Sequence, residues 1–153
     1  GLIKKYCNLL HETYGEKLRA IAIFGSIARG TWNRDSDVDI LIVNDGWDVK
    51  KGWERIIELQ EVKKRLQLTP EFQELLEVGY SPAIQNYPLS IEDATQFHRI
   101  YLDLCLDAII LYDKDEFLEK ILSKFRAELE KRGARRVQLP NGNYYWILKE
   151  AAL

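Results

Sequence analysis

The chain has 153 residues, of which 46% are hydrophobic and 30% are charged, and its formal net charge is −2. These values predict one globular domain over residues 1–153 and argue against a nucleic-acid partner, which would need a local basic patch. The apolar stretches are too short to cross a membrane. Cys7 and Cys105 lie in apolar helical patterns that favour buried free thiols over a disulfide or metal site. We therefore expect a cytoplasmic protein without a membrane partner.

Apolar spacing predicts alternating helices and strands in the first half of the chain. The predicted elements are a helix over 2–14, strands over 18–24 and 38–43, and helices over 48–66 and 70–78. The run over 18–24 is apolar at nearly every position, which is typical of a strand buried on both faces. The second strand ends at the turn signal Asn44-Asp45-Gly46, and Thr69 before Pro70 predicts a helix start.

The second half continues this alternation. The predicted elements are a strand over 80–88, a helix from the capping signal at Ser90 through Cys105, a strand over 108–112, a helix ending at Gly133 and a hairpin around Asn141-Gly142. Either Asp113 or Asp115 can cap the last helix. The pattern predicts a mixed α/β domain with a sheet of four or five strands, helices packed mainly on one side, and a C-terminal β-hairpin.

Candidate phosphate-binding and metal-binding residues lie between the first two predicted strands. Gly25 lets the backbone approach a phosphate closely, and Ser26 offers a hydroxyl and a free N–H at the start of a helical turn. Asp37 and Asp39 are two residues apart, so they share one face of a strand. Two such carboxylates suit Mg²⁺, which takes its other ligands from phosphate oxygens. Each pair alone is often only a turn or a polar strand edge, but together they predict a site for a triphosphate and a divalent metal.

These residues also resemble a known signature. Gly25-Ser26-Ile27-Ala28-Arg29-Gly30, followed by Ser36-Asp37-Val38-Asp39 and four apolar β-formers, resembles the DNA polymerase β-type nucleotidyltransferase superfamily, and most of all its minimal, MNT-like prokaryotic members. The resemblance implies a nucleotidyltransferase-like sheet, an NTP donor with ATP as first choice, and Mg²⁺ as cofactor. It assigns nucleotide binding to Gly25, Ser26, Arg29 and Gly30, and metal binding and catalysis to Asp37 and Asp39. Arg29 could instead pair with an acid to hold the turn.

The resemblance also implies a third carboxylate from a neighbouring strand. The expected strand, 80–88, contains no Asp or Glu, so Gln85 or Asn86 could occupy that place without being able to take a proton. Glu77 is a possible substitute, or simply a solvated charge at a helix end. Two functions follow. The first is a Mg²⁺-dependent nucleotidyltransferase that acts on a hydroxyl group. A hydroxyl on a protein is the first candidate acceptor, and a small molecule or an RNA end is left open. The second is a nucleotide-binding regulatory or antitoxin-like module with a toxin-like partner.

Three weaker features complete the candidates. A basic run near the end of the last helix either complements the helix terminus or contacts phosphate or nucleic acid. Tyr144, Tyr145 and Trp146 are interpreted as core and sheet-face residues, with stacking on a base as the alternative. Trp32 and Arg34 either border the nucleotide or fill space in the loop. The basic run consists of Lys131, Arg132, Arg135 and Arg136.

Overall fold

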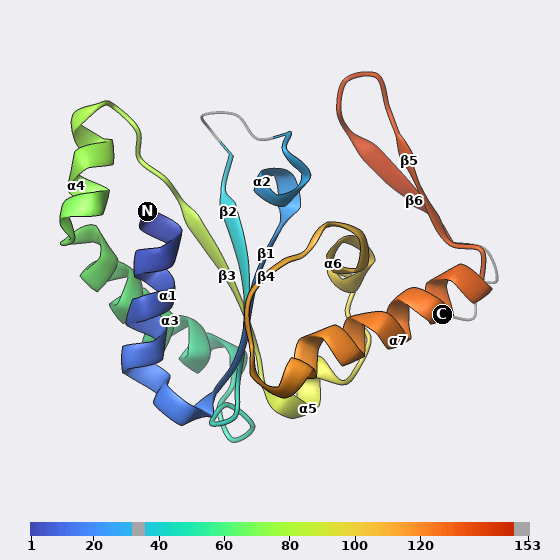
Figure 1. Cartoon of the computed structure of the whole chain (residues 1–153), viewed down its shortest axis with the longest axis horizontal. Coiled ribbons are helices and arrows are strands. Elements are labelled where there is room, and N and C mark those ends of the chain that lie inside the picture. The colour runs from blue at the N-terminus through green and yellow to red at the C-terminus, as the bar shows by residue number, and fades with distance from the viewer. Residues whose placement is uncertain (32–35, 149–153) are drawn as a thin grey trace.

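A four-stranded mixed sheet forms the centre of the molecule (Figure 1). The structure is a computed structural model that describes residues 1–31 and 36–148. Its strands are β1 (Leu18–Phe24), β2 (Val38–Asn44), β3 (Ile84–Leu89), β4 (Ile109–Asp113), β5 (Arg135–Gln138) and β6 (Tyr144–Ile147). The sheet order is β3-β2-β1-β4, and β5 and β6 form a separate hairpin. β1 runs antiparallel to β2 and β4, whereas β2 and β3 are parallel. The predicted fold class, the adjacency of the first two strands and the C-terminal hairpin are confirmed.

Helices cover both faces of the sheet, so the prediction that they pack mainly on one side is wrong. The helices are α1 (Leu2–Tyr14), α2 (Gly25–Arg29), α3 (Gly52–Gln67), α4 (Pro70–Glu77), α5 (Ile91–Ala94), α6 (Tyr101–Asp107) and α7 (Phe117–Lys131), with 3₁₀ turns η1 (Gly15–Lys17) and η2 (Lys114–Glu116). Successive residues of β1 enter opposite cores: Ile21 packs with α1, α3 and α4, and Ala22 packs with α5, α6 and α7. Because β1 and β2 are apolar on both faces, each face needs its own helical layer.

The single helix predicted from Ser90 to Cys105 is divided into α5 and α6. Ser90 caps α5 as predicted, since its hydroxyl accepts a hydrogen bond from the backbone N–H of Asp93 at 3.0 Å. The end of α5 is satisfied by side chains, because Tyr101 donates to the carbonyl of Ala94 at 2.6 Å and His98 lies 2.7 Å from the carbonyl of Asp93. The Ala94 carbonyl thus accepts from a side chain where a continuing helix would have supplied a backbone N–H, and the Asp93 carbonyl also accepts from the backbone N–H of Gln96.

Asp113, one of the two predicted caps, is the residue that caps α7. Its carboxylate accepts hydrogen bonds from the backbone N–H groups of Leu118 at 2.8 Å and Glu119 at 2.9 Å. A carboxylate at this position satisfies donors that have no partner inside the helix and also favours the positive end of the helix dipole.

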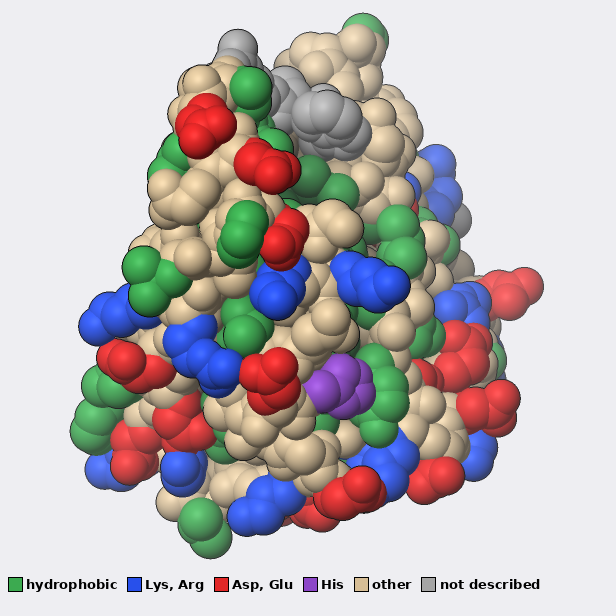
Figure 2. Space-filling model, turned by 60° about the vertical axis from the view of Figure 1, so that its left-hand side comes forward, with side chains coloured by type: hydrophobic (Ala, Val, Ile, Leu, Met, Phe, Trp, Pro, Cys, Tyr) green, Lys and Arg blue, Asp and Glu red, His purple; other side chains and the backbone are tan. Residues whose placement is uncertain are grey.

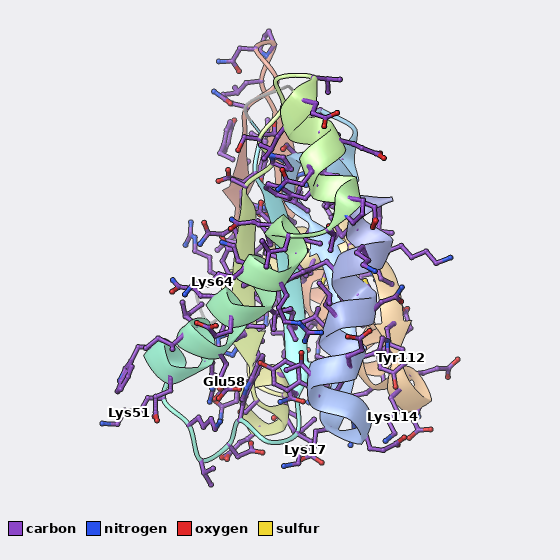
Figure 3. All side chains as sticks on the ribbon, turned by 90° about the vertical axis from the view of Figure 1, so that its left-hand side faces the viewer. Lys17, Lys51, Glu58, Lys64, Tyr112 and Lys114 are labelled. Carbon is purple, nitrogen blue, oxygen red and sulfur yellow. The ribbon has the colours of Figure 1, made fainter. Side chains whose placement is uncertain are left out.

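Glu58 links three segments on the face formed by α1, α3 and α4, which Figure 3 views from the front. Glu58 lies on α3. Its carboxylate accepts hydrogen bonds from Tyr14 Oη and Trp47 Nε1, both at 3.2 Å, and pairs with Lys50. Burial alone would raise the pKa of Glu58, but the hydrogen bonds from Lys50 and Trp47 outweigh it and lower the pKa. This carboxylate therefore fixes the end of α1 and the segment after β2 against α3.

The surface carries both signs of charge. On the face in Figure 2, Lys and Arg side chains are interspersed with Asp and Glu over the middle and lower part of the view. Cys7 and Cys105 are free thiols, as predicted. Among residues 1–31 and 36–148, no helix combines the length and the apolar character that crossing a membrane would require.

Candidate active site

The end of β1 and the beginning of β2 form one wall of a pocket. The two strands pair Phe24 with Asp39, so the residues that follow β1 lie beside those that lead into β2. The pocket has a volume of about 350 Å³. It is lined by Phe24, Gly25, Ser26, Arg29, Asp37, Asp39, Tyr87, Ile100, Asp103 and Tyr144. All predicted site residues except Gly30 are in this lining. Gly30 ends α2 in the left-handed conformation, with φ of 76°. Trp32 and Arg34 lie outside the described residues.

Gly25 is in contact with Asp39 and could not be another residue without displacement. Its φ is +78°, and a Cβ added to it would lie 2.2 Å from Asp39 Oδ2 and 3.1 Å from Asp39 Cγ. Both the backbone conformation and the close approach therefore require glycine. The turn that carries Gly25 and Ser26 is thus held directly against the carboxylate at the start of β2.

Asp37 and Asp39 lie at the same edge of the sheet and act on each other electrostatically. Asp39 is partly buried and Asp37 is exposed. Burial raises the pKa of Asp39 above its ordinary value of 3.8, and the charges of Asp37 and Asp103 add to this, while Arg29 opposes it. The ionised Asp39 is therefore destabilised by its surroundings, and a bound cation would relieve this.

The two aspartates fit a magnesium ion that shares its coordination with a nucleotide. Mg²⁺ is usually bound by one or two carboxylates together with water and phosphate oxygens, rather than by an all-protein cage. Within the part of the chain that the structure describes, no group of three or more His, Cys, Asp or Glu side chains is arranged to hold a metal ion. Asp37 and Asp39 could therefore hold the metal only with ligands from the substrate and solvent.

Arg29 is anchored on the wall of the pocket rather than free in it. Its guanidinium donates to Tyr144 Oη at 3.3 Å, lies 3.8 Å from Asp107 Oδ2, and sits 4.7 Å from the centre of the Tyr144 ring. Only 16% of its side chain is exposed. The interpretation that Arg29 pairs with an acid is thus supported by this geometry, although the same side chain also lines the pocket.

None of the predicted replacements for the third carboxylate lines the pocket. Asn86 is buried on the opposite face of the sheet, where its side chain accepts a hydrogen bond from Tyr6 Oη at 2.9 Å. Gln85 pairs with Asp39 in the sheet but is exposed and outside the lining. Glu77 is exposed at the end of α4, in agreement with its interpretation as a solvated charge.

Asp103 on α6 is the additional acid in the pocket, and sequence reasoning missed it. Its carboxylate accepts a hydrogen bond from Trp146 Nε1 at 3.3 Å and lies 3.7 Å from the Arg136 guanidinium. The sequence does carry one signal. Asp103 interrupts the run Tyr101-Leu102-Asp103-Leu104-Cys105, whose other four residues are all buried. A charged residue in such a run usually has a partner or a function.

Comparison with known proteins places this chain in a family. Residues 3–102, well over half of the chain, match the family model described as the nucleotidyltransferase domain. The chain belongs to this nucleotidyltransferase family. Two proteins of Methanocaldococcus jannaschii named as candidate protein adenylyltransferases are similar to it. The first is 46% identical over 43 residues, which is 28% of this chain and 43% of that protein. The second is 24% identical over 94 residues, which is 59% of this chain and 95% of that protein. The match thus spans less than half of the first relative.

Two solved structures share the fold of this nucleotidyltransferase domain. One is a chain of a mutant MntA toxin–antitoxin complex, with a TM-score of 0.51 and 19% identity over 85% of this chain and 91% of that chain. The other comes from a toxin–antitoxin complex with AMP-PNP, with a TM-score of 0.50 and 19% identity over 85% of this chain and 92% of that chain. At these identities the likeness establishes the fold.

The pocket of the nucleotidyltransferase domain is completed by residues beyond the matched stretch. Asp103 and Tyr144 both follow residue 102 and both line the pocket. The hairpin that carries Tyr144 is held to α6 because Arg136 forms a two-pronged ion pair with Asp107, including an Nη2–Oδ1 bond of 3.0 Å. Arg136 of the predicted basic run therefore pairs with an acid, as does Arg132, whose partner Glu128 is 2.9 Å away.

Proposed function

We propose that this protein transfers a nucleotidyl group from an NTP, with ATP as the first candidate, to a hydroxyl acceptor and releases pyrophosphate. The observation that carries this proposal is the contact of Gly25 with Asp39. It places a turn suited to phosphate beside two carboxylates suited to a metal, in one open pocket. Membership of the nucleotidyltransferase family supports the reaction class.

The residues of the pocket have complementary roles in this proposal. Gly25 and Ser26 hold the β- and γ-phosphates, since the backbone there can approach an anion closely. Asp37 and Asp39 hold Mg²⁺, which when bound supplies positive charge to the phosphates and orients them. Arg29, fixed by Asp107 and Tyr144, adds a positive charge at the wall of the pocket without having to be ordered during the reaction.

We further propose that the acceptor is a hydroxyl on a protein. The two similar proteins of M. jannaschii are named as candidate protein adenylyltransferases, which supports this choice over a small molecule or an RNA end. A toxin-like partner is the first candidate, because the structures that share the fold come from toxin–antitoxin complexes.

Position-specific labelling of ATP tests the reaction class. The protein is incubated with cell lysate, Mg²⁺ and ATP labelled either at the α-phosphorus or at the γ-phosphorus. Nucleotidyl transfer moves only the α-label to macromolecules, whereas kinase activity moves only the γ-label. Asp37→Asn and Asp39→Asn should each remove the α-label, while Asp45→Asn, which changes an exposed residue just after β2, should keep it. Absence of α-label with all four NTPs would contradict the proposal.

The alternative is a nucleotide-binding regulatory or antitoxin-like module without turnover. It is favoured by the lack of a carboxylate on β3, and by the engagement of Asp103 with Trp146 and Arg136. Calorimetry distinguishes the two functions. Binding of Mg²⁺·ATP that depends on Asp39, with no pyrophosphate released in the presence of lysate, would identify the module.

A further inference from the structure

We propose that Tyr144 of the C-terminal hairpin is itself an acceptor, so that the protein transfers a nucleotidyl group to its own Tyr144 hydroxyl. This inference rests on the proposed function, because it uses the same bound nucleotide and the same pocket. It adds a modification site on a segment outside the stretch that matches the nucleotidyltransferase family.

Tyr144 brings a phenolic hydroxyl to the pocket that holds the phosphate-binding turn and the two aspartates. Its position is fixed by the hairpin, which is anchored to α6 by the Arg136–Asp107 ion pair and by the Trp146–Asp103 hydrogen bond. The acceptor is therefore held in the site without the entropy cost of bringing in a second molecule, which is a large part of the barrier to a two-molecule reaction.

Burial raises the pKa of Tyr144 above its ordinary value, so its hydroxyl needs a nearby base in order to react. Arg29 donates to the phenolic oxygen at 3.3 Å, so the hydroxyl keeps its own proton for an acceptor, and the Asp103 carboxylate lines the same pocket. Ser26 and Tyr87 also line the pocket, but Tyr144 lies on the hairpin that is hydrogen-bonded to Asp103 through Trp146. A carboxylate in the same pocket as the reacting hydroxyl is the candidate general base.

The reaction balances with these groups alone. Tyr144 Oη attacks the α-phosphorus and forms a new oxygen–phosphorus bond, while the bond from that phosphorus to the bridging oxygen of pyrophosphate breaks. The phenolic proton passes to the Asp103 carboxylate, and pyrophosphate leaves. The product is a phosphodiester with one negative charge. The guanidinium groups of Arg29 and Arg136 lie 4.7 Å and 4.9 Å from the centre of the Tyr144 ring, where they would stabilise that charge.

Two properties distinguish this reaction from modification of a partner. The modification occurs once per molecule, because the product consumes the hydroxyl. It is also intramolecular, so its rate constant is independent of protein concentration, whereas transfer between two copies would accelerate as the protein becomes more concentrated.

The test uses the purified full chain with Mg²⁺ and ATP labelled at the α-phosphorus, followed by intact-mass measurement and peptide mapping. We expect one nucleotidyl group on Tyr144, no label in Tyr144→Phe, and unchanged label in Tyr145→Phe. Tyr145 is the matched control, since it is the next residue of β6, 49% of it is exposed, and it is outside the pocket lining. Asp103→Asn should slow the labelling by about 10²–10⁴-fold, the usual contribution of a general base.

Three outcomes of this test would overturn the inference. Label that persists in Tyr144→Phe, label mapped to Ser26 or Tyr87, or a rate constant that rises with protein concentration excludes intramolecular transfer to Tyr144. Melting curves of Tyr144→Phe that match wild type show that its loss of label is not loss of the fold. If wild type labels a lysate protein but not itself, only this inference is wrong. If it labels nothing and does not bind Mg²⁺·ATP in calorimetry, the proposed function is wrong as well.

Discussion

Replacement of Asp39 by asparagine should separate nucleotide binding from the stability of the fold. The substitution keeps the size of the side chain and removes its charge. The pKa of Asp39 is raised by burial and by the charge of Asp37, so the ionised form is destabilising in the protein without ligand. The attraction of Arg29 opposes this effect. We therefore expect the free energy of unfolding of the unliganded protein to stay the same or rise by about 0–1 kcal/mol, the range of partly solvated charge pairs.

The same substitution should abolish the stabilisation that bound nucleotide gives to the protein. With Mg²⁺·ATP at about one hundred times its dissociation constant, wild type should gain about 2.7 kcal/mol of stability. In a domain of this size that corresponds to a rise of roughly 5–10 °C in the melting temperature. Asp39→Asn should lose this rise. The control is Asp45→Asn, which removes an exposed carboxylate just after the opposite end of β2 and should keep the full rise.

Thermal melts of the three proteins, with and without Mg²⁺·ATP, provide the comparison. One result would refute the reasoning. If Asp39→Asn melts clearly lower than wild type without ligand, yet still gains the full stabilisation with ligand, Asp39 holds the turn through Arg29 and does not bind the metal.

Three further predictions follow from the same contacts. Gly25→Ala should cost about 1–2 kcal/mol of stability because its φ is positive, and it should abolish nucleotide binding because the new Cβ would displace the Asp39 carboxylate. By NMR titration, the pKa of Asp39 should lie above 3.8 and fall in Asp37→Asn. Since the pKa is raised, the contribution of Asp39 to the stability of the unliganded protein should be present below pH 3.8. It should be lost as the pH rises through the raised pKa, while Mg²⁺·ATP binding, which needs the carboxylate, strengthens over the same interval. Tyr6→Phe should cost about 1–3 kcal/mol in urea unfolding, because buried Asn86 loses its partner, and should leave nucleotide affinity unchanged.

Matched controls make these outcomes decisive. Gly15 has φ of +54° and no atom within 4 Å of an added Cβ, so Gly15→Ala should show a backbone cost without loss of binding. Full affinity in Gly25→Ala would show that the close approach to Asp39 is not needed. A changed nucleotide affinity in Tyr6→Phe would contradict the assignment of Asn86 to the face away from the pocket.

Short-range patterns in the sequence were sufficient for the two central strands and half of the site. The apolar runs that became β1 and β2 follow one another along the chain and pair with each other. Their polar flanks, Gly25-Ser26 and Asp37-x-Asp39, therefore had to meet at one end of the sheet. The residues that cap α4, α5 and α7 could also be predicted from the sequence, because a cap depends on atoms only a few residues away.

Only the tertiary structure decided how the elements pack. β1 was interpreted as buried on both faces, yet its two-sided burial did not reveal which helices would form the second layer. The break between α5 and α6 likewise depends on Tyr101 bonding to Ala94, a contact that helical periodicity alone does not predict.

Two further pocket residues, Asp103 and Tyr144, were decided entirely by packing. The predicted position of a third acid was the strand beside β2, but β3 places Asn86 on the far face and the additional acid lies on α6. Tyr144 lies in the pocket because Arg136 of the hairpin forms an ion pair with Asp107 of the same helix. These contacts join residues far apart in the chain, whereas periodicity and spacing report only on neighbours within a few residues. The turn and the two aspartates could therefore be predicted from the sequence, but the residues that close the pocket above them could not.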